Sequence, residues 1–174
     1  MNVTFTRTAE RRYRVSVEGE GLVPSFMEPA PGYDARLPHD MAHFVVESEL
    51  GIRGGVFGQL ADGGHVNTFR PLGERPRTRV VKRGNRLATA NRDDAMRSEK
   101  IVGIAWRLWT TGATIPTAAV EGVSAEDIAR VCRGFEQASA QWSRLRVGES
   151  MTLVWRPTGR ARQRPRGANP RDGP

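Results

Sequence analysis

The sequence predicts an α+β fold, in which a small antiparallel sheet packs against about three helices. Alternating apolar and polar residues near both ends of the chain indicate the strands. Apolar residues at helical spacing between the two ends indicate the helices. The 174 residues suffice for one ordinary domain, which we expect to span residues 1–156. Residues 157–174 are rich in arginine, proline and glycine, and we expect them to form a disordered tail.

The predicted sheet combines an N-terminal hairpin with a C-terminal strand. Residues 3–8 and 12–18 alternate apolar and polar side chains, with Val3, Phe5, Tyr13, Val15 and Val17 on one face, which is typical of two half-buried strands in a hairpin. Residues 149–157 alternate in the same way, and we expect them to pair with the hairpin. The run EPAPGYD lies within residues 19–36, so this segment is predicted to be a loop.

Start and stop residues set the bounds of the helices. Pro38 suits a first helical turn and Gly51 a helix end, so the first helix is expected between them. Asn91 and Gly112 bound the second helix in the same way. The third is expected over residues 124–142, where Ser124 and Asp127 can form a capping box. A short additional helix is expected in GGVFGQLAD, whereas residues 75–86 show no clear period.

The net charge of +8 suggests a phosphate-rich partner, although its origin is ambiguous. Only Lys82 and Lys100 among the 27 basic residues are lysine, and such an excess of arginine is also what GC-rich codons produce. The tail carries five arginines and one aspartate, so it holds half of the net charge. The other basic segment, residues 75–86, contains no acidic residue.

Several classes of protein lack support in the sequence. Cys132 is the single cysteine, so the chain can form neither an intrachain disulfide nor a cysteine metal cluster. No apolar run is long enough to span a bilayer, and the N-terminus shows no apolar signal segment. Together these features favour a cytoplasmic protein. Nucleotide-binding and hydrolase motifs rich in glycine are missing as well.

The segment LPHDMAHFVVESELG contains the candidate site. His39 and His43 lie one helical turn apart, so both imidazoles can bind one metal ion. Asp40 and Glu47 share their arc of the helix, which spans roughly 100°. The remaining positions are mostly apolar, which predicts a helix that is largely buried.

The two carboxylates are candidates for the catalytic groups. Glu47 is eight residues from His39, about 12 Å along the helix, so one ion cannot easily bind both. We expect Glu47 to orient His43 or to hold a catalytic water. Asp40 follows the first histidine, as glutamate does in the zinc peptidases, but its side chain is one methylene shorter.

A third ligand has to come from another segment. His65 is the only other histidine, and carboxylates at Glu74, Asp93, Asp94 or Glu99 are further candidates among which the spacing does not choose. Zinc is the first expectation for the ion, while imidazole also suits iron, nickel and copper. Such a site would fit a metal-dependent hydrolase.

Three alternatives to the metal site stay open. The same four residues can form a metal-free acid–base site, or simply the solvated face of a helix. The chain can also be a nucleic-acid- or ribosome-associated accessory protein, with phosphate contacts at Arg77, Arg79, Lys82, Arg83 and Arg86. A solvated loop is the simpler interpretation of those five residues. A non-catalytic interaction domain is the remaining alternative.

Two resemblances accompany these motifs. The H-D-x-x-H of His39–His43 is similar to the metal-binding motif of the coenzyme Q assembly protein family. That family adds a glutamate after an 11-residue gap, where this chain has Gly55. The wider pattern, from VTFTRT through PHDMAHFVVESELG and GGVFGQLA to the closing VGESMTLVW, resembles a group of small actinobacterial proteins over most of residues 1–156. The second resemblance implies no activity.

Overall fold

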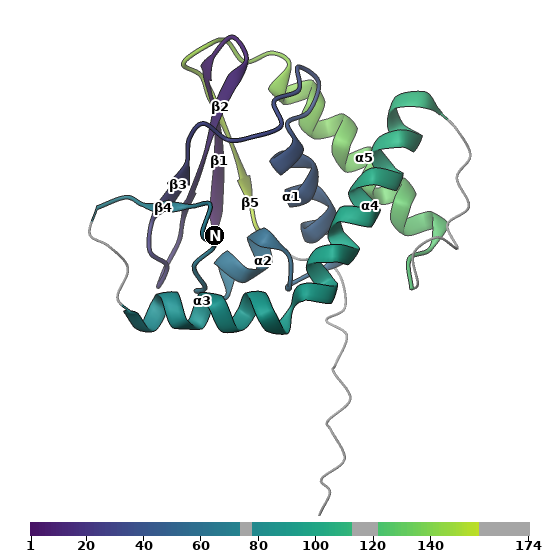
Figure 1. Ribbon diagram of the computed structural model, residues 1–174. Helices are drawn as coiled ribbons and strands as arrows, with labels where there is room; N and C mark the ends of the chain where they lie inside the picture. Colours follow the sequence, from purple (N-terminus) through teal and green to yellow (C-terminus); the bar gives the residue numbers. More distant parts are fainter. Residues whose placement is uncertain (74–77, 113–121, 157–174) are drawn as a thin grey trace, which may run out of the picture.

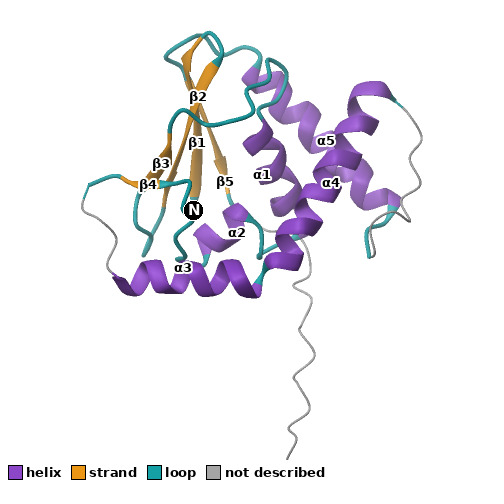
Figure 2. Cartoon of the chain, viewed as in Figure 1, coloured by secondary structure: helices purple, strands orange, loops and turns teal. Residues whose placement is uncertain are grey.

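The computed structural model describes residues 1–73, 78–112 and 122–156, and it confirms the α+β prediction. A five-stranded antiparallel sheet has the strand order β4-β3-β2-β1-β5, with helices gathered on one side of it (Figures 1 and 2). The strands are β1 Asn2–Ala9, β2 Arg12–Glu18, β3 Ser25–Met27, β4 Arg70–Pro71 and β5 Ser150–Val154. The helices are α1 His39–Leu50, α2 Val56–Ala61, α3 Thr78–Ala90, α4 Arg92–Thr111 and α5 Ala125–Trp142.

The strands predicted at the two chain ends form the centre and one edge of the sheet. β1 and β2 make the expected hairpin, with Phe5 opposite Val15. β5 pairs antiparallel with the other side of β1, where Met151 lies opposite Phe5. All three of these apolar side chains are buried, so the alternation in the sequence does mark the inward face.

The sheet is wider than predicted, because the segment expected to be a loop contains a strand. β3 lies within residues 19–36 and pairs with β2, and the two-residue β4 pairs with β3 in turn. Strands of three and two residues are too short for alternation to be recognised in the sequence. Their pairing gives backbone partners to β2, which would otherwise be an open edge.

Five helices are described, compared with the three main helices predicted. α1, α4 and α5 have the predicted positions, and α2 forms in the short segment expected to be helical. The capping box of α5 is present, with Ser124 and Asp127 hydrogen-bonded reciprocally. The helix that the sequence analysis did not predict is α3, in which Val80, Gly84 and Leu87 lie at helical spacing within a largely basic segment.

Aromatic contacts join the helices to the inward face of the sheet. Phe5 of β1 contacts Phe44 of α1 and Phe57 of α2, with ring centroids 6.3 and 6.5 Å apart. Tyr13 of β2 contacts Trp142 of α5 at 6.0 Å. α4 lies against α1 and α5, as Figure 1 shows, and this crossing brings residues of α4 beside the candidate helix. Residues Met41–Glu47 are all buried, as predicted for α1.

None of the described helices combines the length and the apolar character needed to cross a membrane. The tail predicted for residues 157–174 lies outside the described residues.

Candidate metal centre

The N-terminal half of α1 presents the two histidines. Pro38 precedes the helix, and the backbone N–H of His39 donates to the carbonyl oxygen of Gly32, 3.0 Å away, which fixes the start of the helix against the preceding loop. His39 and His43 then lie one turn apart, with ring centroids separated by 4.6 Å. His39 is exposed and His43 is 6% exposed, so the pair extends from the surface into the protein.

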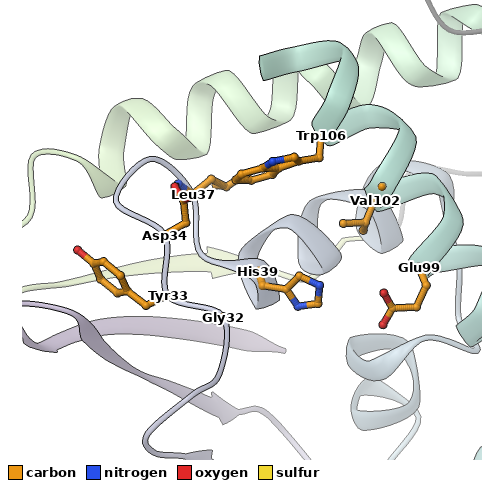
Figure 3. A pocket seen from close by; sticks show the side chains of 9 residues that line it. Gly32, Tyr33, Asp34, Leu37, His39, Glu99, Val102 and Trp106 are labelled. Atoms are coloured by element: carbon orange, nitrogen blue, oxygen red, sulfur yellow. The ribbon is translucent and has the colours of Figure 1, made fainter. Parts of the chain in front are cut away.

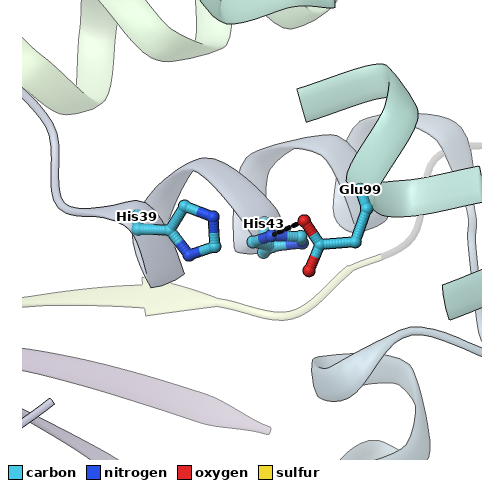
Figure 4. A group of neighbouring side chains, drawn as sticks. All are labelled: His39, His43 and Glu99. Atoms are coloured by element: carbon cyan, nitrogen blue, oxygen red, sulfur yellow. Dashed lines mark ion pairs between the residues drawn. The ribbon is translucent and has the colours of Figure 1, made fainter. Parts of the chain in front are cut away.

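α4 supplies a carboxylate that completes a three-residue cluster. Oε2 of Glu99 lies 3.4 Å from Nε2 of His43. One ligand atom from each of His39, His43 and Glu99 lies within 4.8 Å of the other two (Figure 4). Glu99 is one of the four carboxylates considered from the sequence. His65 was the other candidate for the third ligand, and it is not part of the cluster. It lies in the loop after α2, where its backbone packs against Gly84 of α3.

The state of His43 suits metal binding. Burial lowers the pKa of His43, which favours the neutral imidazole that binds metal ions. Its Nε2 is buried and has no hydrogen-bond partner among the described residues, although the carboxylate of Glu99 lies near it. The separation of 3.4 Å exceeds the usual length of an N–H···O hydrogen bond, about 2.7 to 3.2 Å. It matches the roughly 3.3 to 3.6 Å between two ligand atoms that each lie about 2.0 to 2.2 Å from a tetrahedral zinc ion.

A buried hydrogen-bond chain orients the ring of His43. Nδ1 of His43 lies 3.1 Å from Oγ of Ser98, and that hydroxyl donates to Oε1 of Glu47 at 3.4 Å. When the serine proton points to the carboxylate, the serine oxygen can accept a hydrogen bond from Nδ1–H of His43. In that tautomer Nε2 is the nitrogen that can bind a metal ion.

Glu47 is held at the start of α2 and is fully buried. Its two carboxylate oxygens accept hydrogen bonds from the backbone N–H groups of Val56, Phe57 and Gly58. Burial raises the pKa of Glu47 to about 7, although these hydrogen bonds act in the other direction. Of the two roles expected for this residue, the geometry favours the orientation of His43, which it reaches through Ser98.

Gly55 makes the position of Glu47 sterically accessible. A Cβ atom at Gly55 would lie 2.1 Å from the carboxyl carbon of Glu47. Any larger residue at position 55 would therefore displace the buried carboxylate from α2 and from Ser98.

Asp40 is held by the sheet. The hydroxyl of Tyr13 lies within hydrogen-bond distance of both Oδ2 of Asp40 and the carbonyl oxygen of Pro31. A tyrosine hydroxyl has one proton, so it donates to one of these two oxygens at a time. Burial raises the pKa of Asp40 above its ordinary value. The charges of His39 and Glu99 also act on the pKa of Asp40, which His39 lowers and Glu99 raises.

A pocket of about 400 Å³ opens beside the cluster. His39 and Glu99 line it together with the side chains of Leu37, Val102 and Trp106, and Figure 3 shows them around a common space between α4 and the loop before α1. Tyr33, Asp34 and the backbone at Gly32 and Gly103 complete the lining. The pocket is within the size range of sites for small molecules, about 300 to 1,000 Å³.

The residues predicted to contact nucleic acid lie on a separate element. Arg79, Lys82, Arg83 and Arg86 belong to α3, whereas Arg77 lies outside the described residues.

Ser98 and Tyr13 were not identified as site residues from the sequence. Neither belongs to a recognisable motif, and each reaches the site through the tertiary fold.

Comparison of the chain with protein families, with curated proteins and with solved structures found no match.

Proposed function

We propose that the chain is a metal-dependent hydrolase whose ion is bound by His39, His43 and Glu99. The observation that carries the proposal is the buried Nε2 of His43, which has no hydrogen-bond partner among the described residues, lies 3.4 Å from Oε2 of Glu99 and belongs to a cluster with His39. Leaving a buried polar atom unpaired costs free energy unless something binds it. A metal ion binds all three groups at once.

Zinc is the ion that this ligand set favours. Two histidines and one glutamate form the ligand set of several catalytic zinc sites, where a fourth position is left for water. The same set with more open positions binds iron(II), so iron is the main competitor. The adjacent pocket suits the catalytic arrangement, since a structural zinc site would be closed by a fourth protein ligand.

Asp40 is the candidate general base. Zinc lowers the pKa of a bound water to about 7, and the carboxylate that accepts its proton works best with a pKa near the working pH. The raised pKa of Asp40 moves it in that direction. A zinc ion held by His39, His43 and Glu99 would supply a water of lowered pKa as the nucleophile for an ester or amide. Asp40 would accept the proton of that water and pass it to the leaving group.

The metal content of the purified protein tests the proposal. Protein made without a histidine tag should contain close to one equivalent of zinc by elemental analysis after reconstitution and desalting. His39→Ala, His43→Ala and Glu99→Ala should each bind less than about a tenth of an equivalent, because losing one of three ligands removes most of the affinity. His65→Ala is the matched control and should keep the ion. Loss of zinc in the control alone, or a wild type without bound metal, contradicts the proposal.

Asp40→Asn separates metal binding from hydrolysis. The asparagine cannot accept the proton of the water, so hydrolysis of activated esters by the zinc protein should fall by about 10²- to 10⁴-fold. The zinc content should stay at one equivalent, since Asp40 is not a ligand. Hydrolysis that is unchanged in this variant would show that Asp40 is not the base.

Ser98→Ala tests whether the hydrogen-bond chain supports the metal. Removing the hydroxyl takes away the acceptor for Nδ1 of His43 while all three ligands remain, so the zinc dissociation constant should rise about 10- to 100-fold. Competition with a chromogenic chelator measures this constant. Ser139→Ala, a half-buried serine in α5, is the control and should leave it unchanged. Equal affinities in the two variants would exclude this role of Ser98.

A further inference from the structure

The helix that the sequence did not predict carries a uniform positive face. Arg79, Lys82, Arg83 and Arg86 follow the spacing i, i+3, i+4, i+7, which places them within an arc of about 100° on α3. All four side chains belong to exposed residues. The helix contains no acidic residue, and none of the four cations forms an ion pair with another described residue.

The opposite side of α3 packs against the protein. Gly84 is its one buried residue, and a Cβ there would lie 2.2 Å from the carbonyl oxygen of His65. The side chain of Leu87 lies against Gly64, and Val80 lines a small cavity together with residues of β2 and α2. These contacts hold the helix in one orientation, so the four cations face outward as a set.

We propose that this basic face of α3 binds the phosphate backbone of a nucleic acid duplex. Four cations held on one rigid face, without competing ion pairs among the described residues, complement a dense row of phosphates. This inference is independent of the metal centre and does not rest on the proposed hydrolase.

Two features favour a duplex over other polyanions. A helix that binds a lipid surface inserts an exposed apolar face, whereas the valines and the leucine of α3 are half-buried against the protein. Binding of single strands typically uses aromatic side chains on which bases stack, and α3 has none. The contacts are then with the backbone alone and should be independent of base sequence.

Binding of the full-length protein to a labelled 24-base-pair DNA and to an RNA duplex tests the proposal. Four phosphate contacts give a slope of about −3.6 for log K against log salt, so the affinity of the wild type should fall by roughly 10²-fold between 50 and 200 mM salt. Charge reversal of the four residues to glutamate should weaken binding at 50 mM salt by more than about 30-fold and flatten this slope. A second variant, with glutamine at the same four positions, removes the charges without reversing them. It should also weaken binding, though by less than the glutamate variant does. It serves as the test if charge reversal impairs folding.

The control variant removes the same charge elsewhere. Arg11, Arg12, Arg144 and Arg146 are exposed at the end of the sheet away from α3, where the β1–β2 turn lies beside the segment before β5 (Figure 1). Their reversal to glutamate changes the net charge equally and leaves the tail intact, so it should weaken binding by less than about threefold. Equal losses in the two variants overturn the proposal, because they would show an effect of net charge alone. Binding of the wild type to anionic phospholipid vesicles but not to duplexes overturns it too.

Discussion

Replacing Glu47 by alanine should lower the free energy of unfolding by about 3 to 5 kcal/mol, the largest effect that we expect from one substitution. The carboxylate accepts hydrogen bonds from three backbone N–H groups of α2 and from Ser98, all in a space closed to solvent. Alanine leaves these donors without an acceptor and leaves a cavity where the side chain was. Urea unfolding of the metal-free protein measures the change. Glu10→Ala, an exposed acid in the β1–β2 turn, should alter stability by less than about 0.5 kcal/mol.

The same residue should make stability depend on pH. The pKa of Glu47 is raised from 4.5 to about 7, so the folded state holds its proton more tightly than the unfolded state. Its contribution is therefore present below pH 4.5 and is lost as the pH rises through 7, with a total of about 3 kcal/mol. The lowered pKa of His43 acts in the opposite sense, since that stability is lost as the pH falls below about 6.5.

The contribution of Glu47 is isolated by subtraction. Glu47→Gln cannot titrate but keeps one acceptor oxygen, whereas His43 and Asp40 titrate in both proteins. The difference in unfolding free energy between wild type and variant should therefore shift in favour of the variant by about 3 kcal/mol between pH 4.5 and pH 7.5. A difference that is constant over this range would mean that Glu47 titrates in the folded protein as it does in the unfolded chain.

Removal of one metal ligand should abolish stabilisation by zinc. A ligand that binds only the folded state, at a free concentration about 100 times its dissociation constant, stabilises the protein by about 2.7 kcal/mol. For a chain of this length, that corresponds to a rise in melting temperature of roughly 5 to 10 °C. The wild type and His65→Ala should show this rise with zinc and lose it with chelator.

His43→Ala should show no difference between zinc and chelator. The variant can be less stable than the wild type in both conditions, because His43 is 6% exposed and its truncation leaves a cavity. The comparison within the variant is therefore the informative one. If zinc still raises the melting temperature of His43→Ala by the full amount, the ion binds elsewhere. If zinc does not raise the melting temperature of the wild type, His39 and His43 have a structural role only.

The helix that carries the site was predictable because its signals are local. Pro38 and Gly51 do bound α1, and the two histidines do lie one turn apart. The sequence also indicated that most of the helix is buried. These features follow from helical geometry and apolar pattern, which need no knowledge of the rest of the fold.

The third member of the cluster was not predictable because it depends on a crossing of two helices. Glu99 was one of four carboxylates that the sequence offered as a third ligand, and the spacing did not choose among them. The packing of α4 against α1 brings Glu99 to the two histidines. Ser98 reaches His43 through the same crossing. α3 was missed for a different reason: its apolar residues Val80, Val81, Gly84 and Leu87 do lie at helical spacing, but they are few and lie within a strongly basic segment.

Anomalous X-ray scattering from crystals grown with zinc tests the central claim most directly. Data collected on both sides of the zinc absorption edge should show one strong difference peak within about 2.0 to 2.2 Å of the nearest nitrogens of His39 and His43 and of a carboxylate oxygen of Glu99. A fourth ligand, water, should face the pocket beside Trp106 and Leu37. A zinc peak at His65 or at surface carboxylates, with none between the three proposed ligands, would contradict the account.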